Sequence, residues 1–384
     1  MIESVPACRV AAAVFREEAE PIAQALEEKG IISRYMAPGR FIILEDRKGF
    51  FGIGARSVVT QEPVECISFL VSPEYEAAVL DLIVQSGKLN IPGRGFVFSE
   101  EILIHMAHDL CRVNSVDSEH ALSSTSALSE LTGICCIVQR GQGDAVARLA
   151  LDTGTCVPVI TFGTGTGFRD KLGLLRVTIP AEKEIIVLAA GVDDAGPVMD
   201  LMIEAGGLDQ PGKGFVYLFP LRRGILNTGI WRGGRKHAAS MEQIIATIDE
   251  LKGGTSWRSS SGMSAAKNKA GHKYLLDKVD LTLVCDEGPT GDFVRAAMAA
   301  GAAGATTSKL RHVCPHDSIY ARVSPSRECS NMIVSRNLIP AVTEALERAG
   351  AFRDSAHGLL FSRAVPRACT YLGGQDNRVG SHLT

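Results

Sequence analysis

The strongest constraint on the fold is a unit of helix, glycine loop and strand that occurs three times in the chain. Residues 205–219 read AGGLDQPGKGFVYLF, in which a small-residue helix end leads through a glycine loop into an apolar strand. Residues 86–100, SGKLNIPGRGFVFSE, follow the same order, and residues 349–363, AGAFRDSAHGLLFSR, are a more divergent copy. An internal repeat of this kind predicts that each copy belongs to one recurring structural unit.

Each copy closes a larger pattern of strands and helices. Apolar runs predict strands and helical spacing predicts helices, in the order strand, helix, strand, strand, helix, strand. The three units are expected at residues 7–104, 131–226 and 279–375, with polar linkers at 105–130 and 227–278. This order is the βαββαβ pattern of ferredoxin-like folds, in which two helices pack on one face of a four-stranded antiparallel sheet. The predicted fold class is therefore α+β, with three tandem ferredoxin-like domains.

The pattern also predicts where several individual elements begin and end. We expect residues 101–112 to continue as a helix after the first unit, and a strand at 41–44 to end before a charged, glycine-broken stretch. Residues 163–179 are expected to begin as a glycine-rich loop. Residues 241–251 are expected to form a helix in the second linker, because apolar side chains recur there at helical spacing.

Composition limits the class of protein. The 384 residues carry a net charge of −3 and only 6% aromatic residues, so no basic or base-stacking surface indicates a nucleic-acid partner. The longest apolar run, residues 185–192, is far shorter than the roughly 20 residues of a membrane span. The N-terminus has no basic region typical of a signal peptide. The ten cysteines form no C-x-x-C pair, which favours reduced thiols and a cytoplasmic location.

Several segments carry a resemblance to a known family. The segments are PGKGFVYLFP at 211–220, CIVQRGQGDAVARLALDTG at 136–154, residues 300–311, FGTGTGFRDKLGLL at 162–175 and LKGGTSWR at 251–258. Together with the βαββαβ order, they make the chain resemble the PII family of nitrogen-regulatory signal-transduction proteins, and the last two resemble a PII-like subgroup with a shortened connecting loop.

The resemblance implies both a fold and a function. PII proteins are trimers of ferredoxin-like subunits that bind adenine nucleotides, in many members together with 2-oxoglutarate, in clefts between neighbouring subunits. Three units in one chain would form an intramolecular pseudo-trimer, monomeric in solution. The implied role is nucleotide-binding regulation of a membrane transporter or a metabolic enzyme, with ATP, ADP or AMP as effector and no resident cofactor. The chain departs from the family in lacking a long interaction loop and in placing Lys213 before Gly214.

Two of the glycine loops are candidate anion sites. Glycines allow backbone N–H groups to turn toward one ligand, and a basic side chain adds charge at the same place. The candidate residues are Gly93, Arg94 and Gly95 in the first loop and Gly212, Lys213 and Gly214 in the second. The alternative is a helix cap and tight turn, which also favours glycine. The third copy reads Ser-Ala-His-Gly at 355–358, so we expect its cleft to be degenerate.

A third glycine-rich segment and two arginines complete the candidate ligand site. Glycines alternate with hydroxyls and are followed by basic residues in a set that could wrap phosphate or carboxylate: Gly163, Thr164, Gly165, Thr166, Gly167, Arg169 and Lys171. The alternative is a connecting loop without a ligand. Arg222 and Arg223 follow the last strand of the second unit, where the family places phosphate-binding residues; the alternative is solvated surface charge.

Metal binding and catalysis have weaker sequence support. His312, Cys314 and His316 alternate along the chain, but Pro315 interrupts them, so we predict an ordinary loop and no metal site. No nucleophile with a base or carboxylate pair stands out, so the protein is expected not to be an enzyme. The remaining alternatives are an enzyme that uses a cysteine or lysine at the pseudo-threefold axis or in one cleft, and a scaffold without a ligand.

Overall fold

The computed structural model of the chain describes residues 4–48, 55–111, 113–114, 127–153, 156–167, 181–227, 231–232 and 272–372. The helix expected at 241–251 lies outside these residues. The described elements fall into three successive groups. The first group contains β1 (Val5–Phe15), α1 (Arg16–Glu28), β2 (Arg34–Lys48), β3 (Ala55–Val71), a 3₁₀ turn (Pro73–Tyr75), α2 (Glu76–Gly87) and β4 (Gly95–Ala107).

The second and third groups follow the same alternation. The second contains β5 (Leu131–Gln139), α3 (Gly143–Asp152), β6 (Val159–Thr166), β7 (Glu182–Gly191), α5 (Val192–Gly206) and β8 (Gly214–Leu221), and then β9 (Arg223–Ile225) and β10 (Trp231–Arg232). The third contains β11 (Leu275–Asp286), α8 (Thr290–Ala299), β12 (Ala305–Val313), a 3₁₀ turn (Ile319–Arg322), β13 (Ser326–Ser335), a second 3₁₀ turn (Arg336–Leu338), α9 (Ile339–Arg348) and β14 (Leu359–Thr370).

The helices form because local sequence suits both their ends and their buried faces. Glu17 and Glu18 lie in the first turn of α1, where carboxylates interact favourably with the helix dipole. Ile22 and Leu26, four residues apart, lie on its buried face. Helix α5 ends where Gly207 adopts a left-handed conformation with φ of 57°, a common glycine helix cap.

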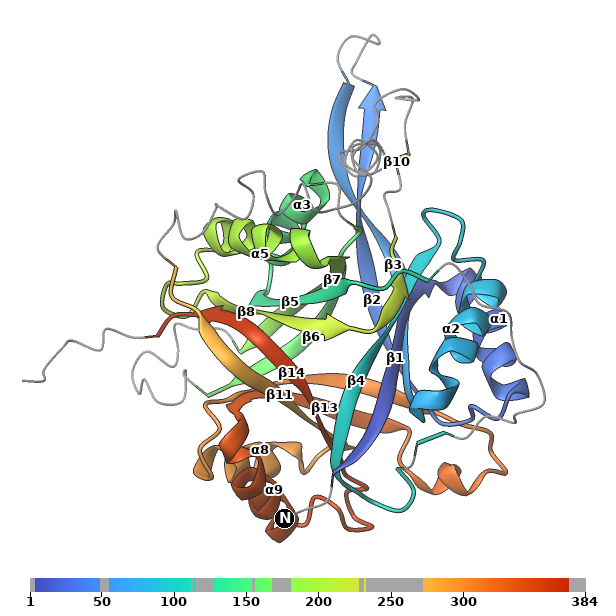
Figure 1. Cartoon of the computed structure of the whole chain (residues 1–384), viewed down its shortest axis with the longest axis vertical. Helices are drawn as coiled ribbons and strands as arrows, with labels where there is room; N and C mark the ends of the chain where they lie inside the picture. Colours follow the sequence, from blue (N-terminus) through green and yellow to red (C-terminus); the bar gives the residue numbers. More distant parts are fainter. Residues whose placement is uncertain are drawn as a thin grey trace, which may run out of the picture.

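The described strands join one sheet. Its 14 strands are antiparallel apart from the short β10–β2 pair, and the path runs β10-β2-β3-β1-β4-β14-β11-β13-β12-β6-β7-β5-β8. Additional pairs β2–β12, β2–β6 and β14–β8 close this path on itself. The result is a closed β-barrel with helices on its outer side (Figure 1). Helices α1 and α2 pack together, as do α3 with α5 and α8 with α9.

The predicted α+β fold of three tandem ferredoxin-like domains is therefore wrong. Strands β14 and β12 each pair with strands of both other groups: β14 with β4 and β8, and β12 with β2 and β6. A free sheet edge leaves backbone N–H and C=O groups unpaired, and these pairings satisfy them by merging the groups into one barrel wall. The alternation seen in the sequence describes the order of elements along the chain and not separate domains.

Three local boundaries also differ from prediction. Residues 101–107 continue strand β4 and do not form a helix, because they pair with β1 and with β14. Strand β2 extends over Arg34–Lys48 and pairs with β3 along its length. Gly163 to Thr166 belong to strand β6, where they pair with β7 and β12, and are not a loop.

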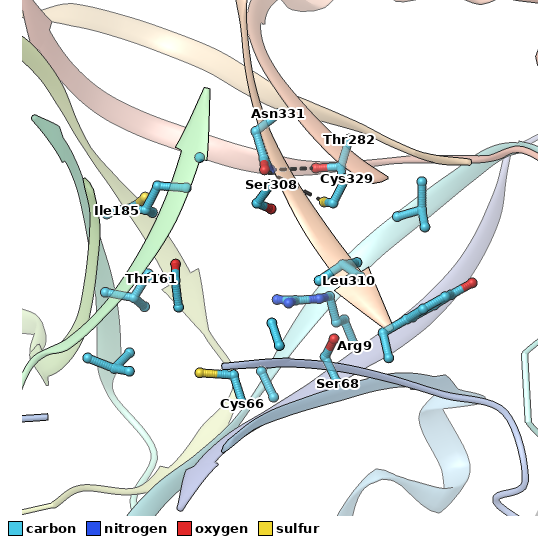
Figure 2. Close-up of a pocket in the computed structure, with 18 of the residues that line it drawn as sticks. Arg9, Cys66, Ser68, Thr161, Ile185, Thr282, Ser308, Leu310, Cys329 and Asn331 are labelled. Carbon is cyan, nitrogen blue, oxygen red and sulfur yellow. Dashed lines mark hydrogen bonds between the residues drawn. The ribbon is translucent and has the colours of Figure 1, made fainter. Parts of the chain in front are cut away.

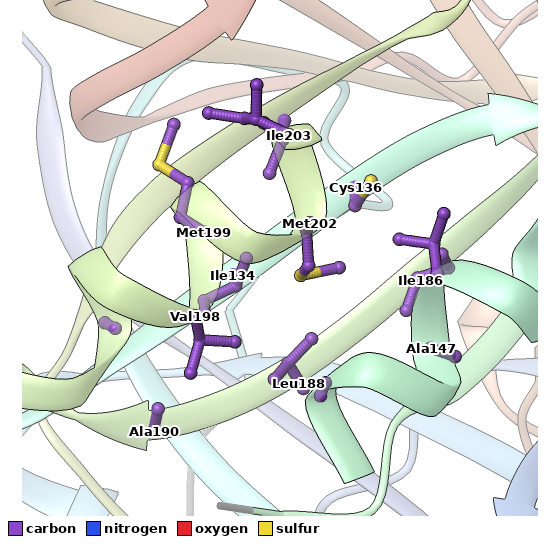
Figure 3. Packing of buried hydrophobic residues seen from close by; sticks show 14 of the residues in the cluster. Ile134, Cys136, Ala147, Ile186, Leu188, Ala190, Val198, Met199, Met202 and Ile203 are labelled. Carbon is purple, nitrogen blue, oxygen red and sulfur yellow. The ribbon is translucent and has the colours of Figure 1, made fainter. Parts of the chain in front are cut away.

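Apolar side chains pack on both sides of the barrel wall. Three outer clusters lie between a helix pair and the sheet. In one of them, Met199, Met202 and Ile203 of α5 pack on Ile134 and Ile186 of the sheet (Figure 3). An inner cluster includes Phe96, Phe98, Tyr217 and Phe219. Within the described part of the chain, no helix combines the length and apolar character required to cross a membrane.

Candidate functional site

The barrel interior contains a chamber of about 540 Å³. Side chains from all three groups of strands line it, since alternate residues of each strand point inward. Figure 2 shows Arg9 of β1 in this chamber, with Cys66 and Ser68 of β3, Thr161 of β6, and Ser308 and Cys329 of the third group around it. The chamber falls within the size range of small-molecule sites in proteins.

The first and last strands of each group pair in an equivalent register. In this register Arg9 of β1 lies opposite Glu100 of β4, and Gly133 of β5 lies opposite Phe219 of β8. Asp280 of β11 likewise lies opposite Arg363 of β14. Corresponding positions therefore carry an arginine and a glutamate, a glycine and a phenylalanine, and an aspartate and an arginine. The three repeats thus differ in charge and size at these positions inside the barrel.

Arg363 connects these positions. Its Nη1 donates to Glu100 Oε2 at 2.6 Å, and its Nε and Nη2 donate to Asp280 Oδ2 at 3.0 and 2.9 Å. Nη2 also donates to the Tyr217 hydroxyl at 3.1 Å, and that hydroxyl donates to Asp280 Oδ2 at 3.0 Å. Asn331 Nδ2 donates to both Asp280 oxygens at 3.1 Å. One guanidinium thus holds two buried carboxylates from different groups of strands.

The second group contributes an aromatic surface to this network. A Cβ atom at Gly133 would lie 2.1 Å from Phe219 Cζ, so the absence of a side chain at Gly133 leaves space for the phenylalanine ring. The Arg363 guanidinium carbon lies 4.0 Å from the centre of that ring. A cation over an aromatic face is stabilised by the quadrupole of the ring, and more strongly when it is desolvated.

The network keeps the Glu100 carboxylate ionised. Burial by itself would raise the pKa of Glu100, but the guanidinium groups of Arg363 and Arg9 outweigh it and hold the pKa below its usual value. The side chain of Glu100 is 1% exposed and that of Asp280 is 0% exposed. Two arginines and two carboxylates therefore balance their charges inside the barrel.

Arg9 is the member of this network with hydrogen-bonding capacity left over. In the described part of the chain, its only side-chain partner is Glu100, to which Nη1 donates. Its side chain is 27% exposed although it lies inside the barrel, so its other N–H groups reach the chamber. The hydroxyls of Ser68, Thr161 and Ser308 also line the chamber, and the described residues offer them no side-chain hydrogen-bond partner.

The chamber thiols are poor nucleophiles. Burial raises the pKa of Cys66 and of Cys329 to about 12 and that of Cys135 to about 11. The thiolate is the reactive form, so thiols that stay protonated at neutral pH are inert. This chemistry gives no support to an enzyme that would use a chamber cysteine.

The glycine-rich segment predicted as a ligand loop partly reaches the chamber. Gly163 and Thr164 line it, whereas Gly165 and Thr166 continue β6 beside β12. Gly167 has φ of 130° and packs closely against the Ala303 carbonyl, so a turn conformation explains the glycine. Arg169 and Lys171 lie outside the described residues.

The other predicted anion residues do not line the chamber. Gly93 and Gly212 adopt positive φ of 91° and 71° in their turns. A Cβ at Gly95 or at Gly214 would lie 2.4 Å from a carbonyl oxygen of the neighbouring strand, so strand packing requires glycine at both positions. Lys213 lies in the turn between Gly212 and Gly214.

Of the three arginines predicted to bind an anion, two form ion pairs with glutamates and one is exposed. Arg94 Nη1 lies 3.1 Å from Glu18 Oε1. Arg222 lies 3.0 Å from buried Glu76 and 3.7 Å from Glu101. Arg223 is exposed at the start of β9. Ligand binding by these loops and arginines stays a prediction.

The residues of 312–316 that were predicted not to bind a metal lie in different environments. His312 is buried and its Nε2 lies 3.0 Å from Ser33 Oγ, whereas His316 is exposed. Cys314 is half-buried. These three residues do not form one ligand group within the described structure.

Sequence reasoning missed Arg9, Glu100, Asp280 and Arg363. A signal was available, since Arg9 and Asp280 each interrupt an apolar run that predicts a buried strand. A charge buried in such a strand must be paired or serve a function. Its partners could not be found locally, because Arg363 and Glu100 are 263 residues apart.

Comparison with known proteins adds no family assignment: no protein-family model matches the chain, and no curated protein is significantly similar to it. The geometry of the chamber is therefore the basis for a functional hypothesis.

Proposed function

We propose that the protein is a regulatory sensor that binds a small organic anion in the chamber inside the barrel. The observation that carries this proposal is Arg9, a guanidinium with N–H groups directed to the chamber and one protein acceptor among the described residues. An arginine beside an enclosed space favours a planar anionic group, such as a carboxylate or phosphate, that accepts two N–H groups at once.

The other charges around the chamber are largely paired. Five basic residues line it, Arg9, Arg140, Lys183, Lys309 and Arg363, together with the acidic Glu100 and Glu182, and Arg363 is also paired with Asp280. Arg140 pairs with Glu182 and Lys309 with Glu287, and these side chains are largely exposed, so they lie toward solvent. Arg9, which has N–H donors beyond its pair with Glu100, is therefore the group that would bind the anion.

The walls limit what else the ligand can be. Alanines, Phe96, Phe98 and Val187 line much of the chamber, so the ligand needs an apolar or aromatic body besides its anionic group. An adenine nucleotide combines both. A triphosphate would bring more charge than Arg9 can neutralise beside Glu100, so AMP or an organic carboxylate is favoured over ATP.

The position of the chamber suggests how binding would be signalled. A ligand there would contact strands of all three groups and would stabilise the closed arrangement over looser ones. A ligand shifts an equilibrium only by its difference in affinity for the two states. We infer that a partner, such as a transporter or a metabolic enzyme, distinguishes the liganded from the unliganded barrel.

The test is a thermal-shift and calorimetry screen with AMP, ADP, ATP, cyclic AMP, 2-oxoglutarate and bicarbonate. A ligand at 100 times its Kd should add about 2.7 kcal/mol to the free energy of unfolding. Arg9→Met should weaken the best ligand about 10- to 150-fold, because a hydrogen bond to a charged group contributes roughly 1.5–3 kcal/mol. Arg9→Lys should retain part of the affinity.

Arg295→Met is the matched control, because Arg295 forms an exposed ion pair with Asp292 and neither residue lines the chamber. Arg363 still holds Glu100 when Arg9 is replaced, so the Arg9 variants are expected to fold. Absence of binding by the whole panel would favour a scaffold. Equal affinity of Arg9→Met and wild type would contradict a role for the chamber.

A further inference from the structure

We propose a divalent metal site on the seam between the first and third groups of strands, formed by His108, Asp354 and His357. One ligand atom from each of these residues lies within 4.8 Å of the others. The two imidazole rings meet edge to face with centroids 4.7 Å apart. His108 follows the end of β4, and the other two residues lie in the loop before β14. The site is separate from the chamber, and the proposal does not rest on the function proposed above.

His357 is oriented as a metal-binding histidine would be. Its Nδ1 lies 2.7 Å from Asp286 Oδ2, so Nδ1–H donates to that carboxylate and Nε2 is left as the metal ligand. Metal-bound histidines commonly donate their second N–H to a carboxylate, which fixes the ring and raises its basicity.

A second layer of contacts holds the carboxylate and the loop. Asp286 pairs with Arg327, whose side chain is 0% exposed, and Arg327 Nη2 donates to the His357 carbonyl at 2.6 Å. His357 itself has φ of 45°, a left-handed conformation that is uncommon outside glycine and asparagine-like residues. In the two other copies of the loop, Arg94 and Lys213 occupy the position before the conserved glycine. The third copy thus has a histidine in place of a basic side chain, and Asp286 and Arg327 hold that histidine in position.

His108 and Asp354 complete a donor set with an open side. His108 Nε2 lies 2.8 Å from Asp354 Oδ1, and the His108 backbone N–H donates to the Gly358 carbonyl at 2.8 Å. Asp354 has a side chain that is 98% exposed, so a hydrated ion can approach from solvent. Two imidazoles and one carboxylate suit Zn²⁺ or Co²⁺, with water in the fourth position.

Metal binding changes the tautomer of the His108 ring. The Leu110 N–H donates to His108 Nδ1 at 3.2 Å, which places the hydrogen of the neutral ring on Nε2 toward Asp354. Coordination through Nε2 moves that hydrogen to Nδ1 and breaks the contact with Leu110. The Leu110 amide is therefore a reporter of binding that a simple surface ion would not affect.

The test uses the full chain after removal of metal with a chelator. Cobalt titration followed by visible absorption should give one tetrahedral-type spectrum at one equivalent, and calorimetry should give one Zn²⁺ per chain. The Leu110 amide signal should shift in an NMR spectrum. His357→Asn should lower the affinity by about 100-fold or more, since loss of an outer partner alone costs 10–100-fold.

The choice of asparagine keeps the loop intact. Asparagine tolerates a left-handed backbone, and its Nδ2 can donate to Asp286 as Nδ1 does, while the metal ligand Nε2 is lost. His316→Asn is the control, because His316 is exposed in the same group of strands and outside the cluster. If His357→Asn fails to fold by circular dichroism, His108→Gln replaces it in the same titration. Absence of one-to-one binding, or binding that these variants leave unchanged, would overturn the proposal.

Discussion

Replacement of Arg363 by methionine should destabilise the barrel more than any surface ion-pair substitution. Methionine retains much of the side-chain length but removes the donors to Glu100, Asp280 and Tyr217. Glu100 keeps Arg9 as a partner, so the charge left without a cation is that of Asp280.

The expected loss of unfolding free energy depends on which partners Asp280 retains. Removal of one partner from a buried ion pair costs about 3–5 kcal/mol, because it leaves an uncompensated charge. Asp280 still accepts from the Tyr217 hydroxyl and from Asn331 Nδ2, so we expect a value near the lower end, about 3 kcal/mol. The Phe219 ring also loses the cation that lies 4.0 Å from its centre.

Urea unfolding at pH 7 measures this cost. Arg295→Met is the control, because Arg295 and Asp292 are both largely exposed and such a pair contributes about 0–1 kcal/mol. Adding Asp280→Asn to Arg363→Met should recover at least about 1 kcal/mol relative to additivity, since the unpaired charge is then absent. Asparagine can accept from Asn331 and donate to the Tyr217 oxygen. A loss below about 1 kcal/mol for Arg363→Met, together with additive effects in the double variant, would show that Arg363 does not compensate a buried charge on Asp280.

Two further predictions concern pH and packing. Burial, with Arg327 and Arg34 nearby, lowers the pKa of His312 to about 4 from an unfolded value of 6.5. The unfolded chain thus binds the proton more readily than the folded protein. The stabilisation by neutral His312 is therefore fully present above pH 6.5, and up to about 3 kcal/mol of unfolding free energy is lost as the pH falls toward 4. His312→Gln should flatten the dependence of unfolding free energy on pH between 7 and 4.5; an unchanged slope would show that other groups cause it. Gly133→Ala should cost about 1–3 kcal/mol, because its Cβ would meet the Phe219 ring, whereas Gly291→Ala in α8, whose nearest neighbour would be 3.7 Å away, should be neutral or stabilising. If Phe219→Leu does not relieve the Gly133→Ala penalty, the clash is not its cause.

The turn glycines show what can be read from short segments. Gly93 and Gly212 recur before a basic residue and a second glycine, and both adopt the positive φ that such a turn requires. Their role in anion binding stays a prediction, and the packing of Gly95 and Gly214 against strands gives a sufficient reason for glycine there. Local pattern thus predicted the backbone conformation and not the chemistry.

Strand β6 shows where the same reasoning failed. Alternating glycine and threonine at 163–166 is typical of a loop, yet β7 and β12 pair with these residues on either side. β-propensity depends on the neighbours that a strand finds, and these neighbours come from other parts of the chain. The same applies to residues 101–107, which β1 and β14 convert to strand.

The amino-acid sequence predicts the alternation of strands and helices, the three loop copies and the turn glycines, because periodicity and φ preference are properties of short segments. The tertiary structure was needed to show that the edges of the three groups merge, as where Phe361 pairs with Ile104 within the barrel wall. It also decided that Arg9, Glu100, Asp280 and Arg363 meet inside that wall and that His357 faces His108. Contacts between residues more than 200 positions apart depend on how the whole chain closes, and no local pattern specifies that closure.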